Sequence, residues 1–256
     1  MAKIPAPFVW HDLITTDVES AKTFYSTVIG WNMQFFPGGS DYTILSAGTI
    51  GIGGIMAIPP GAAERGAPAC WQGYIGVDDV DAQADRAAST GGTILSAPAD
   101  IPNVGRFAVL ADPQGAVFII FKPDGNEPMV TAEPGAPGTV GWNELHAGDG
   151  LKAFDWYSDM FHWTVSRDMD MGAMGVYRLF AAGGEAIGGM MTKMPEMPVP
   201  FWAYYFNVES LDAAVDRTIK AGGKLMHGPQ EVPGPMYIAN CQDPQGAWFS
   251  MVARTR

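Results

Sequence analysis

The pentapeptide Asp112-Pro113-Gln114-Gly115-Ala116 occurs a second time, unchanged, as Asp243-Pro244-Gln245-Gly246-Ala247. Each copy predicts a tight turn between two strands, because Asp favours the first position of a β-turn, Pro presets φ at the second and Gly favours the fourth. The two copies lie 131 positions apart. This offset predicts two tandem repeats of similar length.

Other landmarks extend the repeat in both directions from this turn. The offset is 132 near the start of the repeat, grows to 135 in its middle and returns to 131 before the turn. One register over more than 110 positions indicates tandem homologous domains. The matched landmarks are Trp10 with Trp142, Phe24-Tyr25 with Trp156-Tyr157, Tyr42 with Tyr177, Gly53-Gly54 with Gly188-Gly189, and Gly91-Gly92 with Gly222-Gly223.

Each repeat divides once more into two units of one strand, one helix and three strands. In the first unit, apolar residues at helical spacing predict a helix that begins with a Thr16–Glu19 capping box and ends at Gly30. Short apolar runs between Gly-rich turns predict the strands. The expected elements are strands 8–15, 32–36, 42–47, 52–58, 71–77, 93–95, 107–111, 116–121, 236–241 and 247–253, and helices 79–90, 151–161 and 210–221. The predicted fold is therefore α+β, with four βαβββ units in two domains.

A Pro- and Gly-rich segment separates the two repeats. Its apolar residues do not recur at the spacing of a helix or strand that packs on a core, so the segment is predicted to be a linker. We predict one domain at residues 1–125, a linker at 126–138 and a second domain at 139–256.

Composition restricts the classes of partner. A net charge of −12 argues against nucleic acid and anionic membranes, which require a basic surface. No apolar run approaches the ~18 residues of a membrane span, and the first residues lack the apolar core of a secretory signal. Cys70 and Cys241 form no CxxC motif. We expect a cytoplasmic protein, either a monomer or a homodimer.

The order of these motifs, twice over, resembles the vicinal oxygen chelate superfamily of glyoxalase I, bleomycin-resistance proteins and extradiol dioxygenases. The motifs are Asp17 followed by Phe24-Tyr25 and Gly30-Trp31, the Gly91-Gly92 helix end, and the Asp-Pro-Gln-Gly turn. The resemblance covers about residues 7–125 and 139–254. It implies that each pair of units forms a half-open, eight-stranded barrel whose concave face holds a ligand.

Metal-using members of this family carry His, Gln or Glu at four strand positions around one divalent ion. By the motif spacing, these positions fall here on Trp10, Gln72, Ile119 and a carboxylate-free segment at 52–58. In the second domain they fall on Trp142, Ala203, Ser250 and a residue within 186–191. Only Gln72 could ligate, so we expect no metal and no other cofactor. A shift of one residue would replace Trp10 by His11, and one divalent metal stays the alternative.

Residues two apart on a strand share a face, so Asp12 accompanies Trp10, and Glu144 and His146 accompany Trp142. A carboxylate beside an imidazole can orient it as a general base or hold a polar ligand. The alternative is that Glu144 and His146 bond neighbouring backbone groups. Because the first domain has Ile14 in place of His146, the two cavities should differ in function.

Three further features bear on the ligand. Tyr42 and Tyr177 match across the repeat, which favours core packing but also makes them candidates to line the cavities, with Gln72. Arg106 lies in a predicted hairpin that could reach over the first cavity, or it is a solvated loop residue. Eleven of fifteen methionines follow residue 138, and their flexible thioethers suit either an apolar ligand or core filling.

These observations predict a protein that binds a small, partly apolar molecule without the family metal, as in sequestration by bleomycin-resistance proteins. The proposed catalytic pair is Glu144 and His146. The proposed ligand-binding residues are Trp10, Asp12, Tyr42, Gln72, Trp142 and Tyr177. The alternatives are a metal-dependent or metal-free enzyme (a lyase, isomerase or dioxygenase), and a protein-interaction module with degenerate cavities.

Overall fold

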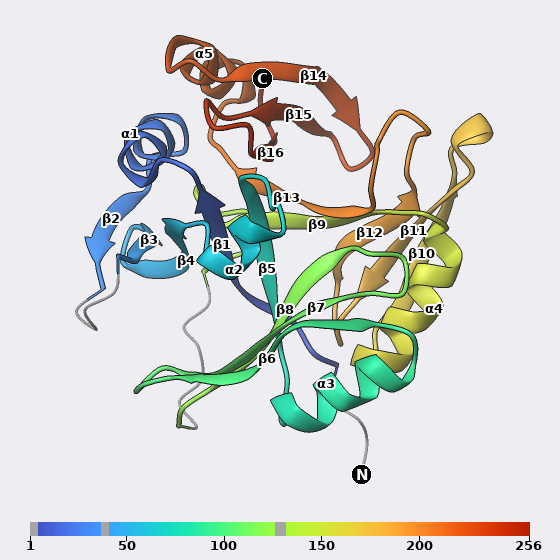
Figure 1. The fold of residues 1–256 in the computed structure, drawn as a ribbon. Coiled ribbons are helices and arrows are strands. Elements are labelled where there is room, and N and C mark those ends of the chain that lie inside the picture. Colours follow the sequence, from blue (N-terminus) through green and yellow to red (C-terminus); the bar gives the residue numbers. More distant parts are fainter. Residues whose placement is uncertain (1–4, 37–40, 126–131) are drawn as a thin grey trace. The chain divides into compact units, whose positions relative to one another are not determined.

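The computed structural model describes residues 5–36, 41–125 and 132–256 (Figure 1). The first half of the predicted linker, residues 126–131, lies outside the described residues, so the linker and the predicted domain boundaries stay predictions. The first repeat contains β1 (Phe8–Thr15), α1 (Val18–Val28), β2 (Asn32–Phe35), β3 (Thr43–Ala47), β4 (Ile50–Ala57), α2 (Pro60–Glu64), β5 (Cys70–Gly76), α3 (Val80–Ser89), β6 (Thr93–Ile101), β7 (Gly105–Ala111) and β8 (Val117–Pro123).

The second repeat follows the same order of strands and long helices, and has a 3₁₀ turn, η1, before its third strand. Its elements are β9 (Val140–Ala147), α4 (Gly150–Phe161), β10 (Thr164–Asp170), η1 (Gly172–Met174), β11 (Val176–Ala181), β12 (Ala186–Thr192), β13 (Phe201–Asn207), α5 (Leu211–Lys220), β14 (Lys224–Val232), β15 (Met236–Gln242) and β16 (Trp248–Ala253). The short helix α2 was not predicted, and β6 is longer than the predicted strand 93–95.

The strands form two mixed sheets of eight strands each. Their orders are β2-β3-β4-β1-β5-β8-β7-β6 and β10-β11-β12-β9-β13-β16-β15-β14. Each sheet keeps two edge strands and is therefore open. The four βαβββ units and the α+β class are confirmed.

The chain divides into two compact units, each of which combines parts of both repeats. Unit 1 contains the described residues 5–10, 72–125 and 142–202, and unit 2 contains 11–36, 41–71, 132–141 and 203–256. The unit boundaries fall inside β1, β5, β9 and β13. Each unit therefore has its own pair of long helices, α3 with α4 in unit 1 and α1 with α5 in unit 2.

The core of unit 2 is a cluster of aromatic side chains beneath α1. Tyr25 is fully buried, stacks on Trp31 at 5.6 Å and meets Trp71 edge-on at 5.3 Å. The Trp71 indole donates to Oη of Tyr25, which in turn donates to Oδ2 of Asp243. This chain of hydrogen bonds satisfies three polar groups inside an apolar core, and so avoids the cost of burying them unpaired.

Unit 1 repeats this design beneath α4. Tyr157 is fully buried and stacks on Trp163 with ring centroids 5.5 Å apart. The Trp202 indole donates to Oη of Tyr157 at 3.0 Å. The tyrosines and tryptophans that match across the repeat therefore form equivalent cores.

The repeated Asp-Pro-Gln-Gly segments are tight turns, as predicted. In the first copy, the amides of Gln114 and Ala116 donate to Oδ1 of Asp112, and the amide of Gly115 donates to its carbonyl oxygen. Gly115 has a φ of 100°, which a side chain would disfavour. The second copy makes the same bonds around Asp243.

The predicted start of the first helix was wrong by one residue. Asp17, not Thr16, caps α1, because its Oδ1 accepts from the amide of Ser20 at 3.0 Å. The capping box assigned to Thr16 and Glu19 is therefore not formed. Glu19 pairs instead with Lys22 on the same helix, at 2.8 Å.

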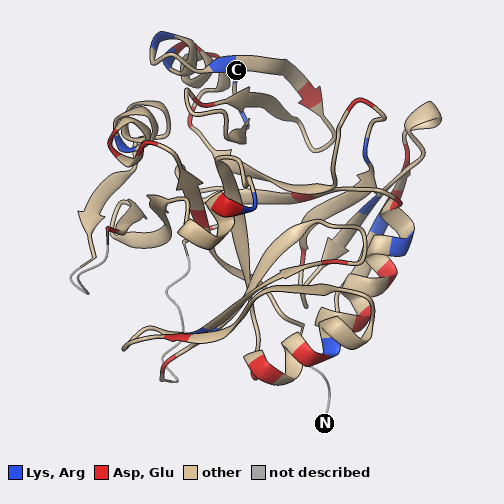
Figure 2. Ribbon diagram, in the orientation of Figure 1, with Lys and Arg blue, Asp and Glu red and all other residues tan. Residues whose placement is uncertain are grey.

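The helices α3 and α4 of unit 1 each carry charged residues of both signs (Figure 2). One ion pair, Arg86 to Asp159 at 2.8 Å, joins these two helices. Arg106 lies on β7 and pairs with Asp81 and Asp100, so it is a surface arginine with two acidic partners. Among the described residues, none of the helices has the length and apolar character needed to cross a membrane.

Candidate functional site

Alternate residues of β9 carry the side chains that the sequence singled out in the second repeat. Trp142, Glu144 and His146 stand two positions apart and therefore share one face of the strand. β12 runs beside β9 in parallel register, with Gly189 opposite Glu144. Together with Tyr177 of β11, these three residues form what we name the β9 cluster, and all four belong to unit 1.

Trp142 and Tyr177 are joined by a short hydrogen bond. The indole Nε1 of Trp142 donates to Oη of Tyr177 at 2.6 Å. The tyrosine ring lies directly over Gly189, where an added Cβ would stand 2.2 Å from Cζ of Tyr177. Glycine is therefore required at this position for the ring to lie flat on the sheet. The two aromatic side chains form one wall of the cluster.

Glu144 and His146 form the polar centre of the cluster. Oε2 of Glu144 lies 3.0 Å from Nε2 of His146, and the two side chains are 11% and 12% exposed. The imidazole stacks on Phe201 with ring centroids 4.9 Å apart and planes at 21°. A carboxylate on one edge and a ring on one face together fix the orientation of the imidazole.

The second nitrogen of this imidazole has no partner among the residues that the structure describes. Nδ1 of His146 is buried and accepts or donates no hydrogen bond there. When Nε2–H of a neutral imidazole donates a hydrogen bond to the Glu144 carboxylate, the other ring nitrogen, Nδ1, is left with a bare lone pair. A buried acceptor left unpaired costs about 1–3 kcal/mol. A hydroxyl or N–H of a ligand would offset that cost.

The first repeat has a related but different arrangement in unit 2. Tyr42 donates from Oη to Oδ1 of Asp12 at 2.6 Å, and its ring lies over Gly54 as that of Tyr177 lies over Gly189. Asp12 is buried and stands opposite Gly54 in the β1–β4 register. Ile14 occupies the place that His146 takes in the second repeat, so the residue two positions after this carboxylate on the same face of the strand is apolar.

The positions that the family resemblance assigns to a metal carry unsuitable side chains. Ile119 is buried in an apolar cluster with Tyr74 and Phe121, and Trp10 packs against that cluster. Gln72 lies half-buried on β5. An imidazole or carboxylate would be needed where Ile119 stands, so these residues do not fit a divalent ion.

The corresponding positions of the second repeat fit no better. Ser250 is buried, and its hydroxyl accepts a hydrogen bond from Nδ2 of Asn240 at 2.8 Å. The side chain of Ala203 has no atom that could ligate a metal. Trp142 is engaged with Tyr177. Over residues 5–36, 41–125 and 132–256, no three His, Cys, Asp or Glu side chains gather closely enough to hold a metal ion.

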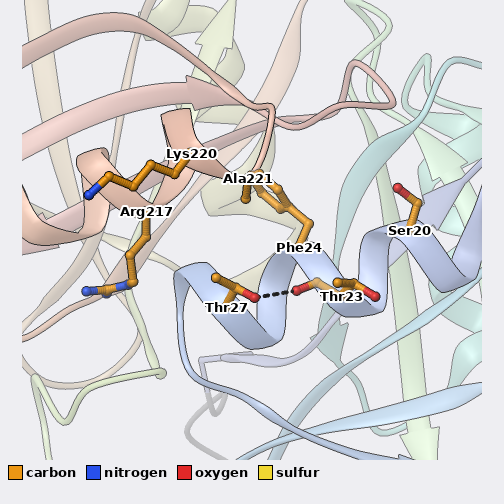
Figure 3. Close-up of a pocket in the computed structure, with 7 residues that line it drawn as sticks. All are labelled: Ser20, Thr23, Phe24, Thr27, Arg217, Lys220 and Ala221. Atoms are coloured by element: carbon orange, nitrogen blue, oxygen red, sulfur yellow. Dashed lines mark hydrogen bonds between the residues drawn. The ribbon is translucent and has the colours of Figure 1, made fainter.

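A separate groove of about 530 Å³ runs between α1 and α5 in unit 2 (Figure 3). Arg217 and Lys220 line it from α5, and Thr23 and Thr27 line it from α1. The guanidinium of Arg217 donates twice to the carbonyl oxygen of Val28, at 2.8 and 3.1 Å, and so caps the end of α1. These contacts give the groove a role in packing the two helices.

The structure brings the predicted residues together in three pairs. Glu144 meets His146, Trp142 meets Tyr177, and Asp12 meets Tyr42. Trp10 packs instead against the cluster around Ile119, and Gln72 lies half-buried on β5. Sequence reasoning missed Phe201, which stacks on the imidazole, and the role of Gly189 beneath Tyr177. The matched Gly-Gly pairs were a usable signal for the glycine. Nothing in the sequence pointed to the ring of Phe201.

Comparison with known proteins identifies the family. The model of the Glyoxalase/Bleomycin resistance protein/Dioxygenase superfamily matches residues 8–120 and again 139–251. A Mycobacterium tuberculosis protein named "Putative glyoxylase CFP32" is 36% identical over 95% of this chain and 93% of its own length. The Anthracycline biosynthesis protein DnrV of Streptomyces peucetius is 32% identical over 97% of this chain and 93% of its own.

Solved structures of low identity share the fold. The Mn(II)-bound glyoxalase from Novosphingobium aromaticivorans aligns with a TM-score of 0.65 at 15% identity, covering 100% of this chain and 84% of that one. The 2,2',3-trihydroxybiphenyl 1,2-dioxygenase from Sphingomonas wittichii aligns with a TM-score of 0.67 at 12% identity, covering 98% and 91%. The chain is therefore a tandem member of the glyoxalase, bleomycin-resistance and dioxygenase superfamily.

Proposed function

We propose that this protein binds a small, partly apolar molecule at the β9 cluster, and that it does so without the metal of its family. The polar end of the molecule donates a hydrogen bond to Nδ1 of His146. Its apolar part lies against the aromatic side chains of Trp142 and Tyr177. The ligand class that fits this combination is an aromatic or polycyclic molecule with a hydroxyl group.

The observation that carries the proposal is the unpartnered Nδ1 of His146. Glu144 holds the other nitrogen at 3.0 Å, and Phe201 holds the ring from one face. A side chain fixed on two sides, with a buried acceptor left over, is preorganised for a third partner, which lowers the entropic cost of binding. The anthracycline-biosynthesis relative supports an aromatic ligand.

The side chains at the positions of the family's metal ligands support a metal-free site. Ile119 lies in an apolar cluster and Ser250 is bonded to Asn240, so neither domain offers four hard ligands. The ligand's orientation then depends on hydrogen bonds and ring contacts instead of on a shared ion.

Titration with 1-naphthol and with naphthalene tests the proposal, because the two molecules differ only in the hydroxyl group. We expect the wild-type protein to bind 1-naphthol more tightly than naphthalene, and His146→Ala to lose most of that difference. His227→Ala is the matched control, since His227 is exposed on β14, where its ring hydrogen-bonds to nearby Gln230. Equal binding of both molecules by all three proteins would remove the basis for the proposal.

A second candidate is an enzyme that abstracts a proton with the same residues. A carboxylate-oriented imidazole is the usual arrangement of a general base, and one relative is named a glyoxylase. In that reaction Nδ1 takes a proton from carbon beside a carbonyl, and Glu144 stabilises the imidazolium that forms. Incubation of 2-hydroxyacetophenone in D₂O tests this candidate. Deuterium uptake at the carbinol carbon that His146→Ala abolishes would favour it over simple binding.

A further inference from the structure

Four exposed apolar side chains gather in two turns of unit 1. Met171 is 37% exposed, Met174 44%, Met194 42% and Val199 59%. A single exposed apolar residue is ordinary, but a group of them at one place marks a binding surface. One turn spans residues 171–175 between β10 and β11, and the other spans 193–200 between β12 and β13.

The strand register places both turns at the same end of the sheet. Asp170, the last residue of β10, pairs with Val176, the first of β11. β11 and β12 are antiparallel, so the end of β12 lies beside the start of β11. Figure 1 shows the two turns, in gold and orange, rising from this common end of the strands.

The β9 cluster reaches the same end. β9 is parallel to β12, with His146 opposite Met191, and the amide of Lys193 donates to the carbonyl oxygen of Ala147 at 2.7 Å. The turn at 193–200 leads directly into Phe201, whose ring stacks on His146. The turn at 193–200 is therefore continuous with the imidazole of the candidate site, and the turn at 171–175 lies at the same end of the sheet.

Both turns have an ordered backbone that carries flexible side chains. The amide of Met171 donates to Gly175 at 2.8 Å, and the amide of Met197 donates to Met194 at 3.0 Å. Nζ of Lys193 closes the second turn on the carbonyl oxygen of Met197. Unbranched thioether side chains on a fixed backbone change rotamer at low cost and adapt to ligands of different shape. Such side chains also suit a site whose acceptor, Nδ1, is shielded from solvent until a ligand enters.

We propose that Met171, Met174, Met194 and Val199 form an apolar mouth that holds the outer rings of the ligand whose hydroxyl bonds His146. This inference rests on the proposed function and assigns a place to the rings that extend beyond Trp142 and Tyr177. The mouth selects for size: each additional fused ring buries more apolar surface there. Four side chains are too few for a stable protein interface, which buries about 800 Å² on each partner.

A series of phenol, 1-naphthol and 9-phenanthrol tests the mouth. In the wild type we expect the affinity to rise with each ring. In Met171→Gln/Met174→Gln/Met194→Gln the rise should largely disappear, with about a tenfold loss for 9-phenanthrol and little change for phenol. Met226→Gln is the matched control, because Met226 is 45% exposed in the other unit. Melting temperatures of both variants show whether the fold is intact, and the single variants replace the triple one if it unfolds.

The possible outcomes distinguish a failure of the proposed mouth from a failure of the proposed binding site at His146. If His146→Ala weakens 1-naphthol binding but the triple variant keeps the full rise with ring number, the mouth is wrong and the proposed function stands. If neither variant changes binding, both are wrong. Light scattering measures the oligomeric state of the wild type and of the triple variant. A wild-type dimer that becomes a monomer in the triple variant would show that the four apolar side chains form an interface between two copies, and would contradict the proposed ligand-binding mouth.

Discussion

Oη of Tyr25 on α1 donates a hydrogen bond of 3.1 Å to Oδ2 of Asp243, which lies 218 positions later in the closing turn of the second repeat. Asp243 also accepts two backbone amides of its own turn through Oδ1. One buried carboxylate thus fixes a tight turn and connects it to a helix of the other repeat. Both residues lie in unit 2, so this bond helps to explain why a compact unit combines parts of two repeats.

Tyr25→Phe should therefore lower the stability of the protein. The substitution leaves Oδ2 of Asp243 buried without this donor, and the Trp71 indole without its acceptor. We expect a loss of about 1–3 kcal/mol in the free energy of unfolding, measured by urea denaturation. Tyr237→Phe, at a half-buried position on β15, serves as the control and should stay within about 0.5 kcal/mol of wild type. A similar effect of both substitutions would contradict the importance of this bond.

The stability of the protein should respond to pH through the two turn carboxyls. Burial raises the pKa of Asp112 and of Asp243 above the ordinary value, although backbone and tyrosine hydrogen bonds oppose the rise. The folded state then holds these protons more tightly than the unfolded state does. Their contribution to stability is complete below the unfolded pKa of about 3.9 and is lost as the pH rises through the folded pKa.

Asp243→Asn isolates this effect because asparagine does not titrate. The free energy of unfolding of the wild type, relative to that of the variant, should fall as the pH is raised from about 3.5 to 7. Urea denaturation at several pH values measures the difference. A difference that grows with pH would mean that hydrogen bonds, and not burial, decide the pKa of Asp243.

Gly189→Ala should displace the ring of Tyr177. The new Cβ would meet Cζ at 2.2 Å and Oη at 2.3 Å, so the ring must move and Trp142 loses its acceptor. We expect a cost of about 1–3 kcal/mol and weaker binding of 1-naphthol. Gly184→Ala in the turn between β11 and β12 is the control, because an added Cβ there meets nothing within 4 Å. Unchanged naphthol affinity in Gly189→Ala would exclude Tyr177 from the binding wall.

Removal of divalent metal should leave the protein unchanged. We expect protein purified without a histidine tag to hold less than about a tenth of an equivalent of metal, and its melting temperature to stay the same after EDTA treatment. Ile119 and Ser250 occupy two of the positions that carry metal ligands in metal-using family members, and neither side chain is a suitable ligand. Near one equivalent of metal, with a clear loss of stability on chelation, would overturn the proposed metal-free site.

The repeat made much of this fold predictable. Identical turns at Asp112 and Asp243 fixed the offset, and strand periodicity then placed Glu144 and His146 on one face. The capping residue of α1 was misplaced because Thr16 and Asp17 are both good caps, and only the backbone geometry decides between them.

The contacts across strands were less accessible to sequence reasoning. The bond from Trp142 to Tyr177 and the stacking of Phe201 on His146 depend on side-chain rotamers and on neighbours far along the chain. Periodicity assigns a residue to a face but does not choose its partner. The division into units that mix both repeats also depends on packing, which the linear order of the motifs does not contain.

The measurement that tests the central claim most directly is ¹⁵N NMR of the four histidines during titration with 1-naphthol. The contact with Glu144 favours the tautomer that carries its proton on Nε2 and leaves Nδ1 bare. On binding, we predict that the Nδ1 signal of His146 moves in the direction of an accepted hydrogen bond, while the signals of exposed His227 stay in place. Saturable binding of 1-naphthol with an unchanged Nδ1 signal would show that the ligand lies elsewhere, and would contradict the proposed site.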